Sequence, residues 1–294
     1  MLSYFNKPME NKRLTAYKPV LCCPDCHGSL VWTEENAACS VCHRPFPIKN
    51  GKVYFIKPPS EKSSDSDFQK KQMFGVSLTG KIHNFGRKFV SGEYAPVNHL
   101  KDFLSKIKPG SRVVDIGSGG TRLREDVFTV DLFAFPEVDV LSDAAKLPFM
   151  DNSVDFVVLD TILEHVPEPQ KIIDEIHRCL KPAGEVICIT TFIFPYHGYP
   201  AHYFNFTKDG LAFIFRNFSK NRVMVNMGPT SALVNLASEY FAVILSGKNH
   251  FLYTLCKGLF LIPIFLFKYL DLFWLLSEEK NNRLASHLCV TAIK

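Results

Sequence analysis

The fold of this chain is decided by residues 113–120, VVDIGSGG, where an apolar run leads into a glycine-rich turn. Branched apolar residues suit a parallel strand that is buried on both faces. Gly117, Gly119 and Gly120 allow the backbone to turn sharply, and they allow a ligand to approach without meeting a Cβ atom. The pattern therefore predicts a strand followed by a nucleotide-binding turn.

Three further predicted strands end in, or lead to, acidic side chains. The run FTVD ends at Asp131, Asp143 follows the next short run, and VDFVVLD ends at Asp160. A carboxylate after the second strand can accept hydrogen bonds from both hydroxyls of a ribose. Each acid alone could brace a turn or sit solvated at a strand end, but together with Asp115 they favour a ligand site at one edge of the sheet.

Segments whose apolar residues have helical spacing alternate with these strands. Apolar residues recur at helical intervals over 97–108 and 170–180, and 185–191 is rich in β-forming residues. This alternation predicts an α/β fold with a doubly wound, mostly parallel sheet. The segment between Gly120 and Asp131 is short, so we expect the first helix to be truncated or replaced by a loop. No third glycine completes a Gly-x-Gly-x-x-Gly motif, which argues against a dehydrogenase.

Residues 113–218 resemble the class I S-adenosylmethionine-dependent methyltransferases, in the branch called methyltransferase type 11. In that family the glycine turn lies under the methionine part of the cofactor, the acid after the second strand holds the ribose, and the acid after the third meets the adenine. The resemblance implies a Rossmann-like methyltransferase fold and S-adenosyl-L-methionine as cofactor. It rests on the glycine turn, the acids, the Leu-Pro-Phe at 147–149, the Leu-Glu-His-Val at 163–166 and the Leu-Lys-Pro-Ala-Gly at 180–184. The residues that it assigns to the cofactor are Asp115, Gly117, Gly119, Gly120, Asp131, Asp143, Ala144 and Asp160.

The loop after the fifth strand, 194–207, is dense in aromatic rings and imidazoles. It resembles a His-x-x-Pro-x-Asp-Tyr-x-Arg-x-Thr pattern of the same branch. The pattern departs where its Asp and Arg are replaced by His202 and Asn205, which puts the usual acceptor in question. It is matched at His197, Pro200, Tyr203 and Thr207.

His197 is the first candidate for a general base, because an imidazole can accept the proton of an oxygen or nitrogen nucleophile near neutral pH. The alternative is a histidine that only closes the loop by hydrogen bonding. His165, after the fourth strand, is a second candidate, although a structural contact is the more common role there. Tyr196, His202 and Tyr203 complete the predicted acceptor site.

Two Cys-x-x-Cys pairs lie near the N-terminus, Cys23 with Cys26 and Cys39 with Cys42. Four thiolates at this spacing can surround Zn²⁺ tetrahedrally, and a site filled by four protein ligands is structural. The segment resembles the small zinc ribbon of Trm112-like proteins. Disulfide bonds are the weaker alternative, because the remaining cysteines show no framework and no secretory signal precedes them.

The chain of 294 residues is long enough for one α/β domain and a metal-stapled ribbon. The formal net charge of +5 is mild and does not by itself indicate a nucleic-acid partner. A small basic and aromatic group over 81–89 is more typical of a solvated face. We expect an N-terminal tail (1–17), the ribbon (18–57), a linker (58–92), and a methyltransferase domain (93–294) with an apolar helical insertion at about 230–282.

The apolar segment 251–276 is shorter than a membrane span needs, and Pro263 divides it into two predicted short helices. Burial within the domain is the simpler prediction, and peripheral contact with a membrane or a lipid-linked acceptor is the alternative. We accordingly expect a cytoplasmic protein, with the inner face of a membrane as the alternative location.

These features favour a methyltransferase for an unidentified small-molecule, glycan or lipid-linked acceptor. An RNA methyltransferase acting on rRNA or tRNA is an alternative, because zinc modules also precede the catalytic fold in some guanine-modifying enzymes. A third reading is a non-catalytic partner protein, against which the intact cofactor positions argue. The sequence identifies no protein partner and does not name the methylated atom.

Overall fold

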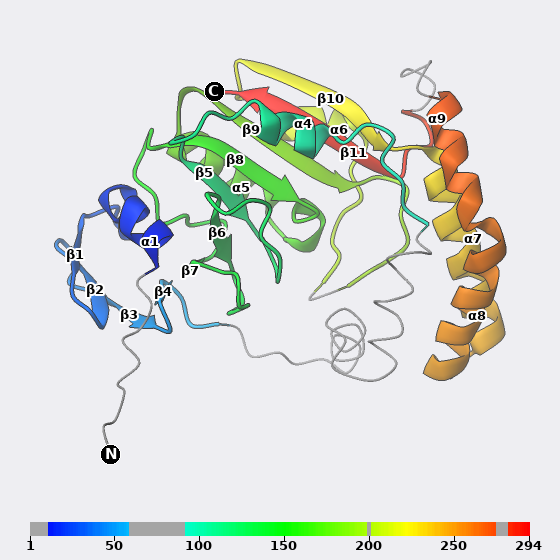
Figure 1. Cartoon of the computed structure of the whole chain (residues 1–294), viewed down its shortest axis with the longest axis horizontal. Helices are drawn as coiled ribbons and strands as arrows, with labels where there is room; N and C mark the ends of the chain where they lie inside the picture. Colours follow the sequence, from blue (N-terminus) through cyan, green and yellow to red (C-terminus); the bar gives the residue numbers. More distant parts are fainter. Residues whose placement is uncertain (1–10, 59–91, 199–200, 275–281) are drawn as a thin grey trace.

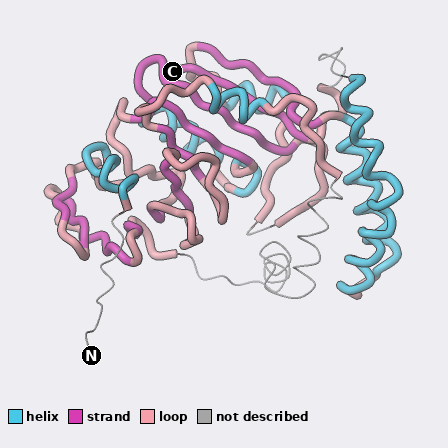
Figure 2. Tube along the Cα trace, in the orientation of Figure 1, coloured by secondary structure: helices cyan, strands magenta, loops and turns pink. Residues whose placement is uncertain are grey.

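The computed structural model describes residues 11–58, 92–198, 201–274 and 282–294. Its strands form an 11-stranded sheet in the order β1-β2-β3-β4-β7-β6-β5-β8-β9-β11-β10 (Figure 1). The small N-terminal strands lie at one end of the molecule, and a long helical pair stands at the other (Figures 1 and 2).

The middle of the sheet is parallel. Its strands are β5 (Val113–Ile116), β6 (Phe128–Asp131), β7 (Val140–Leu141), β8 (Val154–Asp160) and β9 (Leu180–Thr191). The last strand, β11 (His287–Ile293), runs antiparallel between β9 and β10 (Lys220–Met227). This arrangement is a Rossmann-like α/β fold with a mostly parallel sheet and confirms the predicted fold class.

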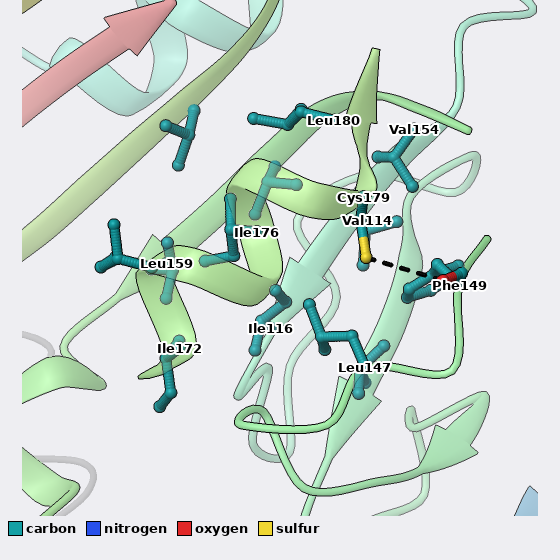
Figure 3. Packing of buried hydrophobic residues seen from close by; sticks show 14 of the residues in the cluster. Val114, Ile116, Leu147, Phe149, Val154, Leu159, Ile172, Ile176, Cys179 and Leu180 are labelled. Carbon is teal, nitrogen blue, oxygen red and sulfur yellow. Dashed lines mark hydrogen bonds between the residues drawn. The ribbon is translucent and has the colours of Figure 1, made fainter. Parts of the chain in front are cut away.

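Both faces of the parallel strands are covered, as their unbroken apolar runs predict. Helix α5 buries Ile172, Ile173 and Ile176 at helical spacing, in one cluster with Val114 of β5 (Figure 3). On the other face Val113 packs in a second cluster with side chains of α4. The helices of this part are α4 (His99–Ser105), the 3-10 turn η2 (Leu163–His165), α5 (Pro169–Cys179) and α6 (Lys208–Ile214).

The segment between β5 and β6 contains no helix, as expected from its length. Arg122 secures this loop, because its guanidinium lies 3.0 Å from the buried carboxylate of Asp139 and also contacts Glu137. The expected turn at 180–184 lies within β9, where the pairing with β8 shifts register and Ala183 has φ of 61°. It is therefore an irregularity inside the strand.

The N-terminal ribbon is continuous with the main sheet. β4 pairs in parallel with β7, and Tyr17 of α1 stacks on Phe128 with ring centroids 4.2 Å apart. The Tyr17 hydroxyl donates a hydrogen bond to the carbonyl of Val113 at 2.9 Å. The elements are α1 (Lys12–Tyr17), the 3-10 turn η1 (Lys18–Val20), β1 (Leu30–Trp32), β2 (Asn36–Cys39), β3 (Pro45–Lys49) and β4 (Lys52–Tyr54).

The insertion before β11 consists of α7 (Pro229–Ser246), α8 (His250–Ile264), the 3-10 segment η3 (Phe265–Leu270) and α9 (Asp271–Trp274). The expectation of two short helices parted at Pro263 is wrong, because α8 passes through Pro263 and continues into η3 and α9. The expectation of burial is also wrong, since α8 has no buried residue. By length and composition, the 24-residue helical run His250–Phe273 could cross a membrane.

Candidate active site

The glycine turn after β5 is tied directly to the end of β6. The backbone N–H of Gly119 donates to Oδ2 of Asp131 at 2.8 Å, and that of Phe133 donates to Oδ1 at 2.8 Å. Gly117 and Gly119 have φ of 71° and 59°, a conformation that favours glycine. A Cβ atom built at Gly119 would meet no other atom within 4 Å. The turn therefore holds Asp131 in one orientation beside open space.

Carboxylates gather at this edge of the sheet, as predicted. Burial and the nearby charges of Asp160 and Asp131 raise the pKa of Asp115 to about 7. Burial raises the pKa of Asp131, against the lowering effect of its backbone hydrogen bonds, while Asp160 is exposed at the end of β8. Clustered acids with raised pKa values favour a positively charged ligand, because such a ligand offsets their repulsion.

The predicted adenine side lies in the turn after β7. Oδ1 of Asp143 accepts a hydrogen bond from the backbone N–H of Ala145 at 2.9 Å, and the carboxylate is exposed. Ala144 is half-buried in the same turn, while Gly120 is exposed in the loop after β5.

Sequence reasoning missed Ser118, which lies between the glycines of the first turn. Its Oγ is buried and has no hydrogen-bond partner among the residues that the structure describes. A buried hydroxyl without a partner indicates that a ligand group belongs beside it. The sequence could have indicated Ser118, because it lies between two glycines of the turn.

On the other side of the site, two histidines from different loops face one another. The rings of His165, in η2, and His197, after β9, lie 4.9 Å apart. Nδ1 of His165 is 2.5 Å from the carbonyl oxygen of Ala201, and Nδ1 of His197 is 3.1 Å from that of Pro195. A neutral ring that donates from Nδ1 keeps the lone pair of Nε2 for another partner.

Glu164 completes this group, although the sequence pointed only to its neighbour. Its side chain is fully buried, and Oε2 accepts a hydrogen bond from Oγ1 of Thr190 at 2.9 Å. Oε1 has no hydrogen-bond partner in the described part of the chain. One carboxylate oxygen and one ring nitrogen from each of His165 and His197 lie within 4.8 Å of one another.

Burial shifts the pKa values of this trio in opposite directions. It raises the pKa of Glu164 to about 7, and it lowers the pKa of His197 to about 3. The pKa of His165 is lowered as well, again mainly by burial. Near neutral pH both imidazoles are therefore neutral, and the glutamate lies close to its titration point.

The predicted acceptor residues surround this trio at the surface. His202 lies 4.4 Å from His197 between ring centroids and 5.6 Å from Tyr196. Tyr196 and Tyr203 are exposed. The backbone N–H of Tyr203 donates to the carbonyl of Glu164 at 2.7 Å, which joins the two loops.

The loop 194–207 lacks the Asp and Arg of the family pattern, and other side chains supply hydrogen bonds that fix it. Asn205 accepts a hydrogen bond from Thr191 at 2.7 Å and donates one to the carbonyl of Phe194. Thr207 caps α6 by accepting from the backbone N–H of Gly210. Pro200 and the 81–89 group lie outside the described residues.

The four cysteines of the ribbon converge. The Sγ atoms of Cys23 and Cys42 are 3.7 Å apart, and those of Cys26 and Cys39 are 3.4 Å apart. Four sulfurs placed about 2.3 Å from a tetrahedral Zn²⁺ would be about 3.8 Å apart, so the cluster fits this ion. Cys22 lies outside the cluster, and burial raises its pKa to about 12, as expected of an inert thiol.

Comparison with known proteins identifies the central segment. Residues 114–188 match the family described as Methyltransferase domain. The demethylmenaquinone methyltransferase of Bacillus velezensis is 32% identical over 88 residues, which are 30% of this chain and 38% of that protein. An uncharacterized chloroplastic methyltransferase of Arabidopsis thaliana is 26% identical over 255 residues, 71% of this chain and 70% of that protein.

A solved structure of similar outline is phosphoethanolamine N-methyltransferase 2 of Haemonchus contortus with phosphomonomethylethanolamine and S-adenosylhomocysteine. The TM-score is 0.46 at 16% identity, and the alignment covers 80% of this chain and 62% of that one. The chain covers 38% of the length of the Bacillus relative.

Proposed function

We infer that this chain, whose residues 114–188 match the family described as Methyltransferase domain, transfers a methyl group from S-adenosyl-L-methionine to a small-molecule acceptor. The observation that carries the inference is the fixing of Asp131 by the glycine turn, beside open space. An acid in this position is oriented to accept hydrogen bonds from the hydroxyls of a ribose.

The residues present fit the cofactor. Asp131 would hold the ribose, and the exposed carboxylate of Asp143 would meet the adenine. The unpartnered Oγ of Ser118 and the acids Asp115 and Asp160 would face the cationic methionine part, whose positive charge would lower the raised pKa of Asp115. When bound, S-adenosylmethionine supplies an electrophilic methyl group on a sulfonium sulfur.

The trio of Glu164, His165 and His197 would accept the acceptor's proton. With a pKa of about 3, His197 alone is a weak base, so it would take a proton from a hydroxyl or amine only with the support of an ionised Glu164. Once ionised, Glu164 would stabilise the resulting imidazolium across the short distance that separates their atoms. Its raised pKa of about 7 means that this support develops as the pH rises through neutrality.

We propose that the four ribbon cysteines bind one structural Zn²⁺. With four thiolates the shell is closed, so the ion supplies stability and leaves no position for a substrate. The proposal is supported by the convergence of the four Sγ atoms and by the backbone N–H groups of Val41 and Cys42, which point at Sγ of Cys39 at 3.4 Å.

The class of acceptor is tested by following a labelled methyl group from the cofactor to the acceptor. The purified chain would be incubated with methyl-labelled S-adenosylmethionine and, separately, with a polar small-molecule extract, a lipid extract and total RNA. We expect label in one of the small-molecule fractions, and none with Asp131→Asn. Label in RNA would overturn the acceptor class, and no transfer to any fraction, with cofactor binding intact, would favour the non-catalytic reading.

A further inference from the structure

The helical pair formed by residues 229–274, here called the α7–α8 hairpin, presents large apolar side chains to solvent. On α7, Leu233, Tyr240 and Ile244 are exposed, and on the α8 side Phe251, Leu259 and Phe273 are 60–74% exposed. Monomeric soluble proteins rarely expose a continuous apolar surface of this extent. The surface therefore requires an apolar partner.

The packing inside the hairpin is the reverse of that in a soluble helical bundle. The residues of α7 that are buried are mostly Ser and Ala, among them Ser231, Ser238, Ala242 and Ser246. Small residues between helices and large apolar residues facing outward are typical of helix pairs surrounded by lipid. In water, the large side chains would be expected inside.

Two charged side chains in the middle of the hairpin pair with each other. Between Pro229 and Trp274 the acidic residues are Glu239 and Asp271, and the basic residues are Lys248 at the turn, Lys257, and Lys268 near the base. Nζ of Lys257 lies 2.7 Å from a carboxylate oxygen of Glu239, whose other oxygen accepts from the hydroxyl of Tyr253 at 2.6 Å. Each helix thus carries one charge, and the two form a pair. Ionisable groups inside a membrane need such a partner.

The dimensions also suit a bilayer. The 18 residues of α7 correspond to about 27 Å of helix, close to the roughly 30 Å of a hydrocarbon core. In the helical run His250–Phe273, none of the 18 consecutive residues with the highest mean hydropathy is buried. The run is therefore not the core helix of a soluble protein. The turn between the helices carries Lys248, a cation suited to lipid headgroups.

The base of the hairpin is fastened to the catalytic part. Asp271 accepts hydrogen bonds from the backbone N–H groups of Thr230 and Ser231, and the rings of Tyr94 and Tyr269 lie 4.8 Å apart. Figure 1 shows the hairpin beyond the ends of β8 and β9 at which Asp160 and Thr191 lie. The candidate active site opens at this same edge.

We propose that the α7–α8 hairpin inserts into a lipid bilayer, with its turn leading, and holds the catalytic edge at the membrane surface. Both helices return to the same domain, so both ends of the hairpin lie on one side of the bilayer. The proposal does not depend on methyl transfer. If transfer is also confirmed, the site would be placed to receive acceptors that reside in the membrane.

Vesicle flotation tests the proposal with the full zinc-loaded chain. The vesicles are phosphatidylcholine with a minor fraction of phosphatidylglycerol, and the variants are Leu259→Asp combined with Ile262→Asp, and Val31→Asp as control. All three side chains are exposed, so the variants should unfold at the temperature of the wild type. We expect the wild type and the control to float with the vesicles. The fraction of the double variant that floats should be at least tenfold smaller.

Three results would overturn the proposal. One is a wild type that stays at the bottom of the gradient while remaining a monomer in lipid-free buffer. Another is a wild type that forms a dimer and never binds vesicles, together with a double variant that is a monomer. That result would assign the surface to a second copy of the chain. The third is flotation of the double variant equal to that of the wild type.

Discussion

At the residue scale, Glu164 carries more of the site's chemistry than the sequence suggested. It follows a predicted strand beside His165, so its position was foreseeable. Its full burial and unpartnered Oε1 depend on Thr190 and on the loop after β9, which only the assembled sheet brings near. Asp131, in contrast, could be predicted as a site residue from its place after the second strand, because strand ends converge in every parallel sheet.

The stability of the protein should depend on pH through Glu164. Its pKa is 4.5 when unperturbed and about 7 when folded, so the folded state retains the proton between these values. The resulting stability is full below pH 4.5 and is lost as the pH rises through 7, by about 3 kcal/mol. The free energy of unfolding, measured in urea at pH 4.5 and at pH 8, should fall between these pH values by about this amount less in Glu164→Gln than in the wild type. An equal loss in both proteins would contradict the assigned pKa.

Methyl transfer should depend on His197 more than on its half-buried neighbour His202. Removing a general base typically lowers the rate by 10²-fold to 10⁴-fold, so we expect at least about 100-fold for His197→Gln. His202→Gln is the matched control, with an expected loss below about tenfold. With the acceptor found in the labelling experiment, kcat of the wild type should rise with pH around 7 and that of Glu164→Gln should not. A pH profile unchanged by Glu164→Gln would remove the glutamate from the mechanism.

At the element scale, the cysteine cluster of the ribbon was predictable because its four cysteines lie close together in sequence. The pairing of the ribbon with the main sheet was not, because the partner strand β7 is only two residues long and lies far from β4 in the chain. The ribbon core is also continuous with the main core, through Phe46, Phe55 and Tyr17. Loss of zinc should therefore destabilise the edge of the catalytic sheet as well as the ribbon.

Metal analysis tests this element directly. We expect one zinc per chain in the wild type and in Cys22→Ala, and less than half of that in Cys26→Ala. The melting temperature of Cys26→Ala should fall by several degrees more than that of Cys22→Ala, because the small ribbon lacks a sufficient core of its own. A second bound metal that is lost in His197→Gln would contradict the role given to the histidines.

The charge pair of the hairpin allows a double-mutant test. Glu239→Gln and Lys257→Met each leave one uncompensated charge among apolar side chains, so each should weaken vesicle binding. The combined variant removes both charges and should bind at least as well as the wild type. Additive weakening in the double variant would show that the pair is not enclosed by lipid.

At the scale of the whole molecule, alternating strands and helices predicted the mostly parallel sheet. The hairpin differs from its prediction, because a proline does not always end a helix and because the composition of 251–276 does not distinguish a buried helix from an exposed one. That distinction required knowing which side chains of α7 face α8. Pro263 lies in the last turn of α8, which ends at Ile264 and is followed by the 3-10 segment η3.

The most direct test of the central claim is calorimetric titration of the zinc-loaded chain with S-adenosylmethionine and S-adenosylhomocysteine, in the wild type, Asp131→Asn and Asp209→Asn. Asp209 is an exposed acid on α6 and serves as the control. The account predicts micromolar binding in the wild type and the control, and at least about tenfold weaker binding in Asp131→Asn, equivalent to about 1.4 kcal/mol. A folded wild type that binds neither compound would contradict it.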